Sequence, residues 1–184
     1  MTADVWTERL RLSRAMPDDL PEVFAIQSDP RVWTHYPSLR HADTSATVAM
    51  MARWEASWQE AGLGSRVARR RDTGEMVGNG GCTLLGGEVW NVGYRIAGDH
   101  HGQGYATELA RAAVDEARRI APDRPVVAYL VEHNRASAHV AEKLGLELVH
   151  RGPDAGNPDP AVMRLVYADR PLTEEQLAAA LRGI

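Results

Sequence analysis

The residues best suited to chemistry form one glycine-containing run near the middle of the chain. The run consists of His101, Gly102, Gln103, Gly104, Tyr105, Ala106 and Thr107. Small residues let the backbone approach a ligand closely, and the free amide groups at the start of a helix favour a negatively charged group such as a phosphate. The run therefore predicts an anion site, although a plain turn between a strand and a helix would use the same glycines.

Other kinds of chemical site find little support in the sequence. The run lacks both the full Gly-x-Gly-x-x-Gly spacing of dinucleotide folds and the Gly-Lys-Ser or Gly-Lys-Thr ending of a P-loop, so neither NAD nor ATP is expected. His100 and His101 are adjacent and cannot readily converge on one metal ion without further ligands. Cys82 lies among small and apolar residues, which favours a packed thiol. We expect neither a metal site nor a cysteine nucleophile.

The segments beside the run would position it as the turn of a βαβ unit. Apolar residues alternate with polar or small ones over residues 90–96, which predicts a strand with one buried face. Apolar residues then recur at helical spacing over 106–120, and a second apolar run follows at 126–131. Strand, helix and buried strand in this order predict an α/β class of fold with the run at the end of the first strand.

Further elements are expected on both sides of this unit. Before it, the patterns predict a strand at 10–12, helices at 18–26 and 44–59, and a hairpin with arms at 66–71 and 76–85. After it, they predict a helix at 136–144, strands at 146–150 and 162–167, a loop over 152–160, and a tail helix begun by a capping box of Thr173 and Gln176. We expect the tail helix to pack on the domain or on a second subunit.

The composition indicates one globular, soluble domain. The chain has 184 residues, of which 44% are hydrophobic and 25% charged, as in ordinary globular proteins. The formal charge of −4 argues against nonspecific DNA binding, and we interpret the cluster of Arg66, Arg69, Arg70 and Arg71 as a solvated strand edge. A single cysteine and an N-terminus without an apolar run predict a cytoplasmic protein with no membrane role.

Four motifs follow one another in order along nearly the whole chain. They are Thr7, Glu8, Arg9, Leu10, Arg11 and Leu12; then Val92, Gly93 and Tyr94; then residues 101–106; and then Asn134, Ser137, Lys143, Leu144 and Gly145. In order and spacing they resemble the GNAT acetyltransferases, and more narrowly the branch similar to ribosomal-protein amino-terminal acetyltransferases. The resemblance implies an α/β fold (an α+β mixed sheet), mostly antiparallel and flanked by helices, in which two parallel strands splay apart as a V. We expect this domain over 1–170 and a helical extension over 171–184.

The resemblance implies that acetyl-coenzyme A is the cosubstrate. The glycine-containing turn would hold the pyrophosphate, mainly through backbone amides, and the pantetheine arm would pass between the splayed strands. The residues implied in coenzyme binding are Ile96, His101, Gly102, Gln103, Gly104, Tyr105, Ala106, Thr107, Asn134, Ser137 and Lys143.

The same resemblance assigns the chemistry of acetyl transfer. The attacking amine must be neutral, the oxyanion needs hydrogen-bond donors, and the departing thiolate needs a proton. A backbone amide near Gly93 and Tyr94 would polarise the thioester carbonyl. Ser137 would be the general acid, with Asn134 orienting the pantetheine or a water molecule. Asn134 and Ser137 could instead be helix caps only.

Two positions depart from the family pattern. Ala141 stands where many relatives carry a tyrosine as the acid, which gives Ser137 more weight. Asn91, which we count with the catalytic positions, stands where relatives often carry a glutamate, and an amide cannot accept a proton as a base. The general base stays open between Glu132, His35, an ordered water chain and an amine that arrives neutral.

These observations predict direct acetyl transfer to a primary amine within a ternary complex, by a monomer or a homodimer. Trp33, His35, Tyr36 and Trp54 would form the acceptor wall, although the spacing of Trp54 and Trp58 on one helical face also suits core packing. A peptide or protein amino terminus, an amino acid, a polyamine and an aminoglycoside all fit, because variable loops select the acceptor. The net negative charge mildly favours a cationic acceptor.

Two other classes of function compete with an enzyme. A catalytically silent GNAT-like module would bind an acyl-coenzyme A as a sensor or scaffold, in keeping with the missing glutamate and tyrosine. A regulator could bind nucleic acid through the arginine cluster, and its affinity would then fall steeply with salt. We expect no nucleic-acid partner.

Overall fold

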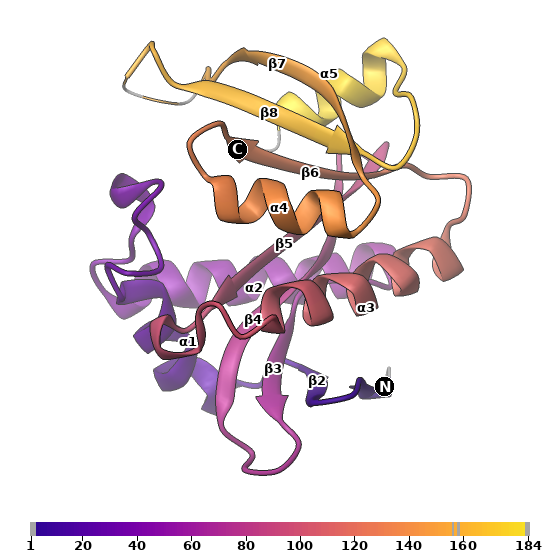
Figure 1. Ribbon diagram of the computed structural model, residues 1–184. Helices are drawn as coiled ribbons and strands as arrows, with labels where there is room; N and C mark the ends of the chain where they lie inside the picture. The colour runs from indigo at the N-terminus through magenta and orange to yellow at the C-terminus, as the bar shows by residue number, and fades with distance from the viewer. Residues whose placement is uncertain (1–2, 156, 158, 183–184) are drawn as a thin grey trace.

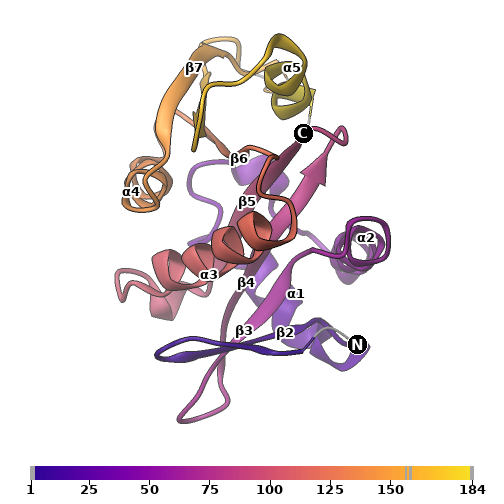
Figure 2. The same ribbon diagram turned by 90° about the vertical axis from the view of Figure 1, so that its right-hand side faces the viewer.

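The computed structural model describes residues 3–155, 157 and 159–182. Residues 1–2 of the expected domain, residues 183–184 of the expected extension, and residues 156 and 158 of the expected loop lie outside the described residues. The described chain forms one eight-stranded sheet with helices on both faces, as Figure 1 and Figure 2 show.

The sheet is mostly antiparallel and contains one parallel pair of strands. Its strands are β1 (Val5–Trp6), β2 (Leu10–Arg14), β3 (Arg66–Arg70), β4 (Met76–Leu85), β5 (Val89–Ile96), β6 (Val126–Val131), β7 (Glu147–Pro153) and β8 (Met163–Ala168). They lie in the order β1-β2-β3-β4-β5-β6-β8-β7, and β5 and β6 are the parallel pair. This mixed sheet confirms the predicted class of fold.

The two parallel strands diverge after a short stretch of pairing. β5 and β6 pair at Trp90 with Val126 and at Asn91 with Val127, although β5 continues to Ile96. Each strand is held on its other side by a continuous antiparallel ladder, β5 by β4 and β6 by β8. The predicted V-shaped splay is therefore present, and it leaves one edge of β5 without a strand partner after Asn91.

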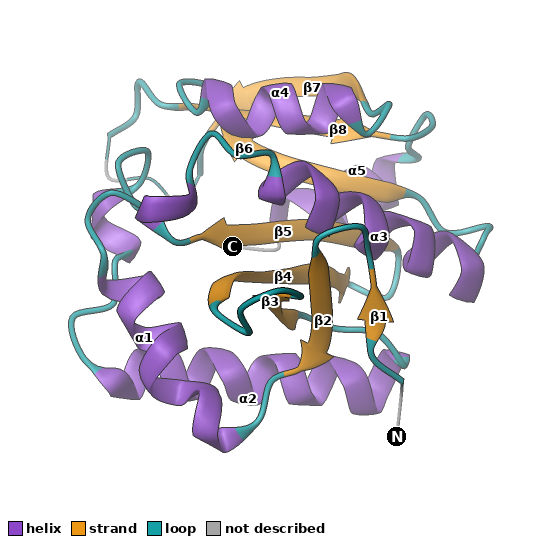
Figure 3. Cartoon of the chain, turned by 60° about the horizontal axis from the view of Figure 1, so that its bottom comes forward, coloured by secondary structure: helices purple, strands orange, loops and turns teal. Residues whose placement is uncertain are grey.

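Helices cover both faces of the sheet. α3 (Tyr105–Ile120) and α4 (Arg135–Lys143) lie over one face, while α1 (Leu20–Ser28), α2 (Thr44–Ala61) and α5 (Glu174–Arg182) lie over the other, as Figure 2 and Figure 3 show. Short 3-10 helices occupy Pro17–Asp19, Pro37–Leu39 and Gly98–His100. α2 begins where the sequence predicts, because the Asp43 side chain accepts a hydrogen bond from the Ser45 amide at 2.8 Å.

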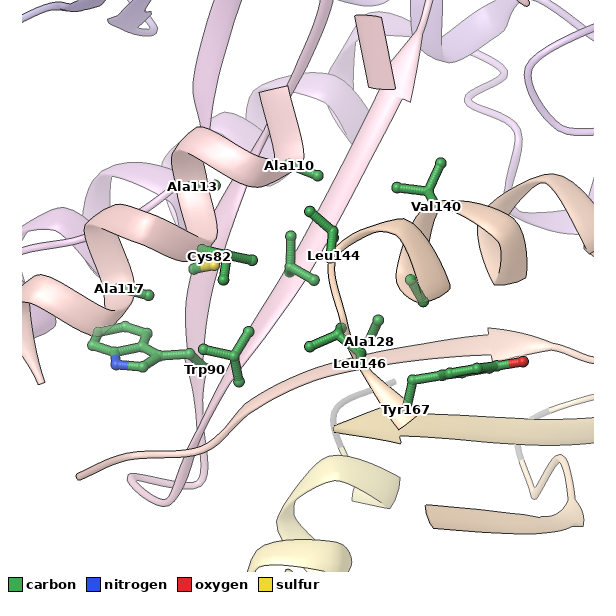
Figure 4. Packing of buried hydrophobic residues seen from close by; sticks show 14 of the residues in the cluster. Cys82, Trp90, Ala110, Ala113, Ala117, Ala128, Val140, Leu144, Leu146 and Tyr167 are labelled. Carbon is green, nitrogen blue, oxygen red and sulfur yellow. The ribbon is translucent and has the colours of Figure 1, made fainter. Parts of the chain in front are cut away.

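The main hydrophobic core lies between the sheet and helices α3 and α4 (Figure 4). α3 presents Ala110, Ala113 and Ala117 to this core, and such small side chains let the helix lie close to Trp90 of β5. Cys82 is fully buried in the same core, which confirms the predicted packed thiol, and burial raises the pKa of that thiol well above its usual range. This packing holds α3, and with it the preceding turn, in a defined position on the sheet.

The arginine-rich segment does not form a sheet edge, so the hypothesis of a solvated strand edge is wrong. β3 lies between β2 and β4. Arg66 is 3% exposed and pairs with Glu116 of α3 at 2.7 Å, and Arg69 pairs with Asp19 at 2.8 Å. The covering strand β2 comes from a segment distant in the sequence, and local patterns do not reveal such pairing.

The C-terminal helix packs on the sheet of its own chain. The Gln176 amide donates to Thr173 Oγ1 at 3.2 Å and the Thr173 amide donates to Gln176 Oε1 at 3.0 Å, which confirms the capping box. Ala180 of α5 is buried beside Val89 and Val127. No helix in the described part of the chain is long and apolar enough to cross a membrane.

Candidate active site

The glycine-containing run forms the turn that leads from β5 into α3. Gly102 and Gly104 have φ angles of 76° and 84°, in the left-handed region that favours glycine. A Cβ atom at Gly102 would meet no other atom within 4 Å, so the turn is open on that side. The first amide groups of α3 have no partner inside the helix. This arrangement suits a phosphate or another anion.

Residues near the N-terminus hold this turn in place. The Arg9 guanidinium donates to the Gln103 carbonyl at 2.9 Å and to Glu108 of α3 at 2.7 Å. The Thr7 hydroxyl donates to the other carboxylate oxygen of Glu108 at 2.6 Å. No local pattern in the sequence links these residues, because Glu108 is 99 positions from Arg9.

Two side chains of the turn point back toward the protein backbone. His101 Nε2 lies 2.9 Å from the Ile96 carbonyl oxygen, and Gln103 Nε2 donates to the Asp99 carbonyl at 3.0 Å. These contacts fasten the turn to the end of β5. Backbone amides, rather than these two side chains, are therefore the donors that an anion in the turn would meet.

A cavity of about 420 Å³ lies between this turn, the end of β5, the start of α4 and the loop after α1. Every residue predicted to bind the coenzyme lines this cavity except Gln103. Those lining residues are Ile96, His101, Gly102, Gly104, Tyr105, Ala106, Thr107, Asn134, Ser137 and Lys143. The structure thus brings together three segments that are separate in the sequence.

Tyr94 and Ser137 meet in the opening between β5 and β6. A hollow of about 50 Å³ lies there, lined by both residues and by Gly93. Burial raises the pKa of Tyr94, while a side-chain hydrogen bond with Ser137 and the charge of Arg95 act in the opposite direction. The Ser137 amide donates to Asn134 Oδ1 at 3.1 Å, so Asn134 is a helix cap. The capping role and a chemical role for the Ser137 hydroxyl are compatible.

The polar face of β5 contains Asn91, Gly93 and Arg95 at alternate positions. A Cβ atom at Gly93 would have Asn91 Nδ2 as its nearest neighbour at 3.9 Å, so space is open above this glycine. Asn91 Oδ1 and Arg95 Nε are buried without a hydrogen-bond partner. In the sequence, the only local signal of the position of Arg95 is its alternation with apolar neighbours.

The four residues predicted to form the acceptor wall lie in two different environments. His35 lines the cavity, whereas Trp33, Tyr36 and Trp54 are buried together in a second hydrophobic cluster. Trp33 reaches the site indirectly, because its ring lies under the Arg95 guanidinium at 4.3 Å. Core packing is the role that the structure gives Trp54, since α2 turns this side chain toward the sheet rather than toward the cavity.

The two side chains considered as a base have different electrostatic environments. Glu132 pairs with Arg151 at 2.7 Å, and this hydrogen bond lowers the pKa of Glu132. Burial, aided by the charges of Arg95 and His133, lowers the pKa of His35 to about 4. His35 is therefore a neutral imidazole at neutral pH, and Glu132 is occupied by an arginine. Within the described ranges, no group of three or more His, Cys, Asp or Glu side chains could hold a metal ion.

Comparisons with known sequences agree with this geometry. The family described as "Acetyltransferase (GNAT) domain" matches residues 9–147. The chain is 34% identical over 148 residues to the uncharacterized protein YkkB of Bacillus subtilis strain 168, and the match covers 76% of this chain and 83% of that protein.

Solved structures share the fold. An acetyltransferase from Agrobacterium tumefaciens strain C58 is 30% identical, with a TM-score of 0.74 and coverage of 93% of this chain and 96% of that chain. RimL, a ribosomal-protein alpha-N-acetyltransferase solved with coenzyme A, has a TM-score of 0.76 at 18% identity, covering 90% and 97% of the two chains. With the family match spanning most of its length, the chain belongs to the GNAT acetyltransferases and is an acetyl-coenzyme A-dependent N-acetyltransferase.

Proposed function

We propose that this enzyme acetylates a primary amine by direct attack while both substrates are bound. The observation that carries the proposal is the opening between β5 and β6, where the free edge of β5 at Gly93 lies beside Tyr94 and Ser137. In the reaction a carbon–nitrogen bond forms, the carbon–sulfur bond of the thioester breaks, and the sulfur receives a proton. No enzyme nucleophile is needed, in keeping with the buried Cys82.

Acetyl-coenzyme A supplies the activated acetyl group. The amides of the turn at Gly102 and Gly104 would bind its pyrophosphate, assisted by the positive end of the α3 dipole. The backbone of β5 after Asn91 lacks a partner strand, so an amide near Gly93 and Tyr94 is free to donate to the thioester carbonyl. This donor comes from the splay of the sheet and needs no side chain.

Ser137 would donate the proton that the departing sulfur requires. Its hydroxyl lies at the start of α4 and faces the hollow between the parallel strands. Tyr94 lines the same hollow and the main cavity, so its hydroxyl would replace that proton from the side of the cavity. This pair occupies the role that many relatives give to a tyrosine at the position of Ala141.

His35 would accept the proton that the amine loses. It lines the cavity and is neutral at neutral pH. Glu132 is a weaker candidate because Arg151 holds its carboxylate. Because the pKa of His35 is low, this imidazole serves best with an acceptor that binds as the free amine. Ordered water would share the proton transfer.

An N-terminal α-amine is one acceptor that the fold accommodates. RimL and a ribosomal-protein-S5-alanine acetyltransferase from Vibrio fischeri share this fold. Their likeness supports the proposed RimL-like branch. The residues at the other end of the cavity would select the acceptor.

The first experiment is calorimetric titration of acetyl-coenzyme A into the wild type, Gly104→Trp and Gly74→Trp. Gly74, in the β3–β4 turn, has a φ of 76° and open space around it, so Gly74→Trp matches the backbone strain far from the site. We expect saturable binding by the wild type and by Gly74→Trp, and its loss in Gly104→Trp. Absence of binding by the folded wild type would refute the proposed role of the turn in binding acetyl-coenzyme A.

A screen of amines then separates an enzyme from a sensor. Release of the coenzyme A thiol is measured with peptides, amino acids, polyamines and aminoglycosides as acceptors. Turnover with at least one amine supports the proposal. Binding of acetyl-coenzyme A without turnover on any amine would instead favour the catalytically silent module, which Asn91 and Ala141 make a specific alternative.

A further inference from the structure

Arg95 differs from the other arginines that the fold buries. Arg66 is 3% exposed and pairs with Glu116 at 2.7 Å, and Arg164 is 4% exposed and pairs with Asp154 at 2.6 Å. Arg95 is half-buried near the end of β5, and in the described part of the chain no carboxylate oxygen lies within 4.0 Å of its nitrogens. A buried charge without a counter-ion costs free energy, so this exception needs a cause.

The contacts of Arg95 leave hydrogen-bond donors unused. Its guanidinium lies over the ring of Trp33 at 4.3 Å, and Nη1 donates to the Tyr94 carbonyl at 2.8 Å. Its buried Nε has no partner. Stacking uses the face of the guanidinium, whereas the N–H donors lie in its plane, so the stack fixes the group without consuming the donors.

The position of these donors indicates that their ligand is the acceptor. Arg95 lines both the main cavity and the hollow between β5 and β6. It alternates along β5 with Tyr94 and Ile96, and so projects from the other face of the strand, beside Gly93. The guanidinium therefore borders the hollow next to Gly93.

No acidic group of the protein neutralises this end of the cavity in the ranges that the structure describes. Among the described residues that line the main cavity and the hollow, none is an aspartate or a glutamate. The charge of Arg95 contributes to the lowered pKa of His35. The local field is therefore positive although the whole chain has a formal charge of −4.

We propose that Arg95 binds a carboxylate of the amine acceptor, and that the acceptor is an amino acid or a peptide with an acidic group near its amine. The inference rests on the proposed function, since it names the substrate class of the same site. A carboxylate can receive two parallel N–H donors from a guanidinium. Polyamines and aminoglycosides would instead bring a second cation beside Arg95, which disfavours them.

The test uses acceptors in matched pairs, namely an amino acid with its amide and an acidic dipeptide with its amide-side-chain counterpart. We expect the wild type to prefer the acid member by on the order of 10- to 100-fold in kcat/KM, the range for hydrogen bonds to charged groups. Arg95→Met removes the preference without changing acetyl-coenzyme A affinity, and Arg95→Lys keeps part of it. Arg119→Met, an exposed position at the end of α3, is the matched control and leaves the preference intact.

Several results would overturn this assignment. Equal or better use of the amide member by the wild type would do so, as would an unchanged preference in Arg95→Met. Weaker acetyl-coenzyme A binding by a folded Arg95→Met would place Arg95 in the coenzyme site instead. If no amine is acetylated, each pair is titrated into the coenzyme A-loaded protein. The carboxylate site is supported, although transfer has failed, if the wild type binds the acid more tightly and Arg95→Met does not. Equal binding of the acid and the amide by the wild type refutes it.

Discussion

The two ends of the cavity are stabilised in different ways. At the coenzyme end, Arg9 pairs with Glu108 at 2.7 Å and fastens the glycine turn. At the acceptor end, Asn91 Oδ1 and Arg95 Nε are buried without partners. Buried polar groups in folded proteins are normally hydrogen-bonded. His100 Nδ1 beside the turn is also buried without a partner, so both ends of the cavity retain unpaired polar groups. What distinguishes the acceptor end, among the described residues, is that its unpaired group belongs to the charged guanidinium of Arg95.

The largest effect on turnover is expected at Ser137, where the two ends of the cavity meet. Ser137→Ala removes the proposed proton donor, and turnover should fall by about 10²- to 10⁴-fold, the usual contribution of general acid catalysis. Acetyl-coenzyme A affinity should change little, because the turn is untouched. Steady-state kinetics together with calorimetry would measure both. Parallel losses of turnover and affinity would show that Ser137 holds the coenzyme rather than supplying a proton.

A second prediction compares a paired buried arginine with the unpaired one. Asp154→Ala leaves Arg164 buried without its counter-ion, and the free energy of unfolding should fall by about 3–5 kcal/mol. Arg95→Met removes a charge that has no counter-ion, so the free energy should change by less than about 1 kcal/mol. Urea denaturation of both variants would measure the difference. A comparable loss in Arg95→Met would mean that Arg95 contributes to the fold rather than to the acceptor site.

The smallest effect concerns the pH dependence of stability. The pKa of His35 is about 4 in the folded state and near 6.5 when unfolded, so between these values the unfolded chain binds the additional proton. The contribution of His35 to the free energy of unfolding is thus present above about pH 6.5 and is lost as the pH falls toward 4. After allowance for solvent screening the loss is about 1–2 kcal/mol. Thermal denaturation of His35→Gln should show a flatter profile in this window, and an unchanged slope would contradict it.

Local patterns predicted much of the coenzyme end. Alternation over 90–96 corresponds to β5, and helical spacing over 106–120 corresponds to α3. The turn between them was therefore placed correctly from adjacent residues alone. The two-residue strand β1 was missed, because so short a segment becomes a strand only by pairing with β2.

The acceptor end was predicted less well. Aromatic residues in the loop after α1 and in α2 suggest a wall. Trp33, Tyr36 and Trp54 are buried together, and only His35 of the predicted set lines the cavity. Aromatic side chains serve cores and binding sites alike, and their types do not reveal which role they take. The sequence gives no sign of the role of Arg95, because the pattern of a strand does not reveal whether a carboxylate will reach its arginine.

The main elements, the glycine turn and the family can be read from the sequence alone, because each depends on residues close together in the chain or on motifs in a fixed order. The pairing of charges, by contrast, becomes visible only in the folded chain. In the folded chain Glu108 pairs with Arg9 and Asp154 pairs with Arg164. Arg95 instead faces the cavity and stacks on Trp33. Pairing of this kind follows from how distant segments pack on the sheet, and this packing is what gives the acceptor end its chemical character.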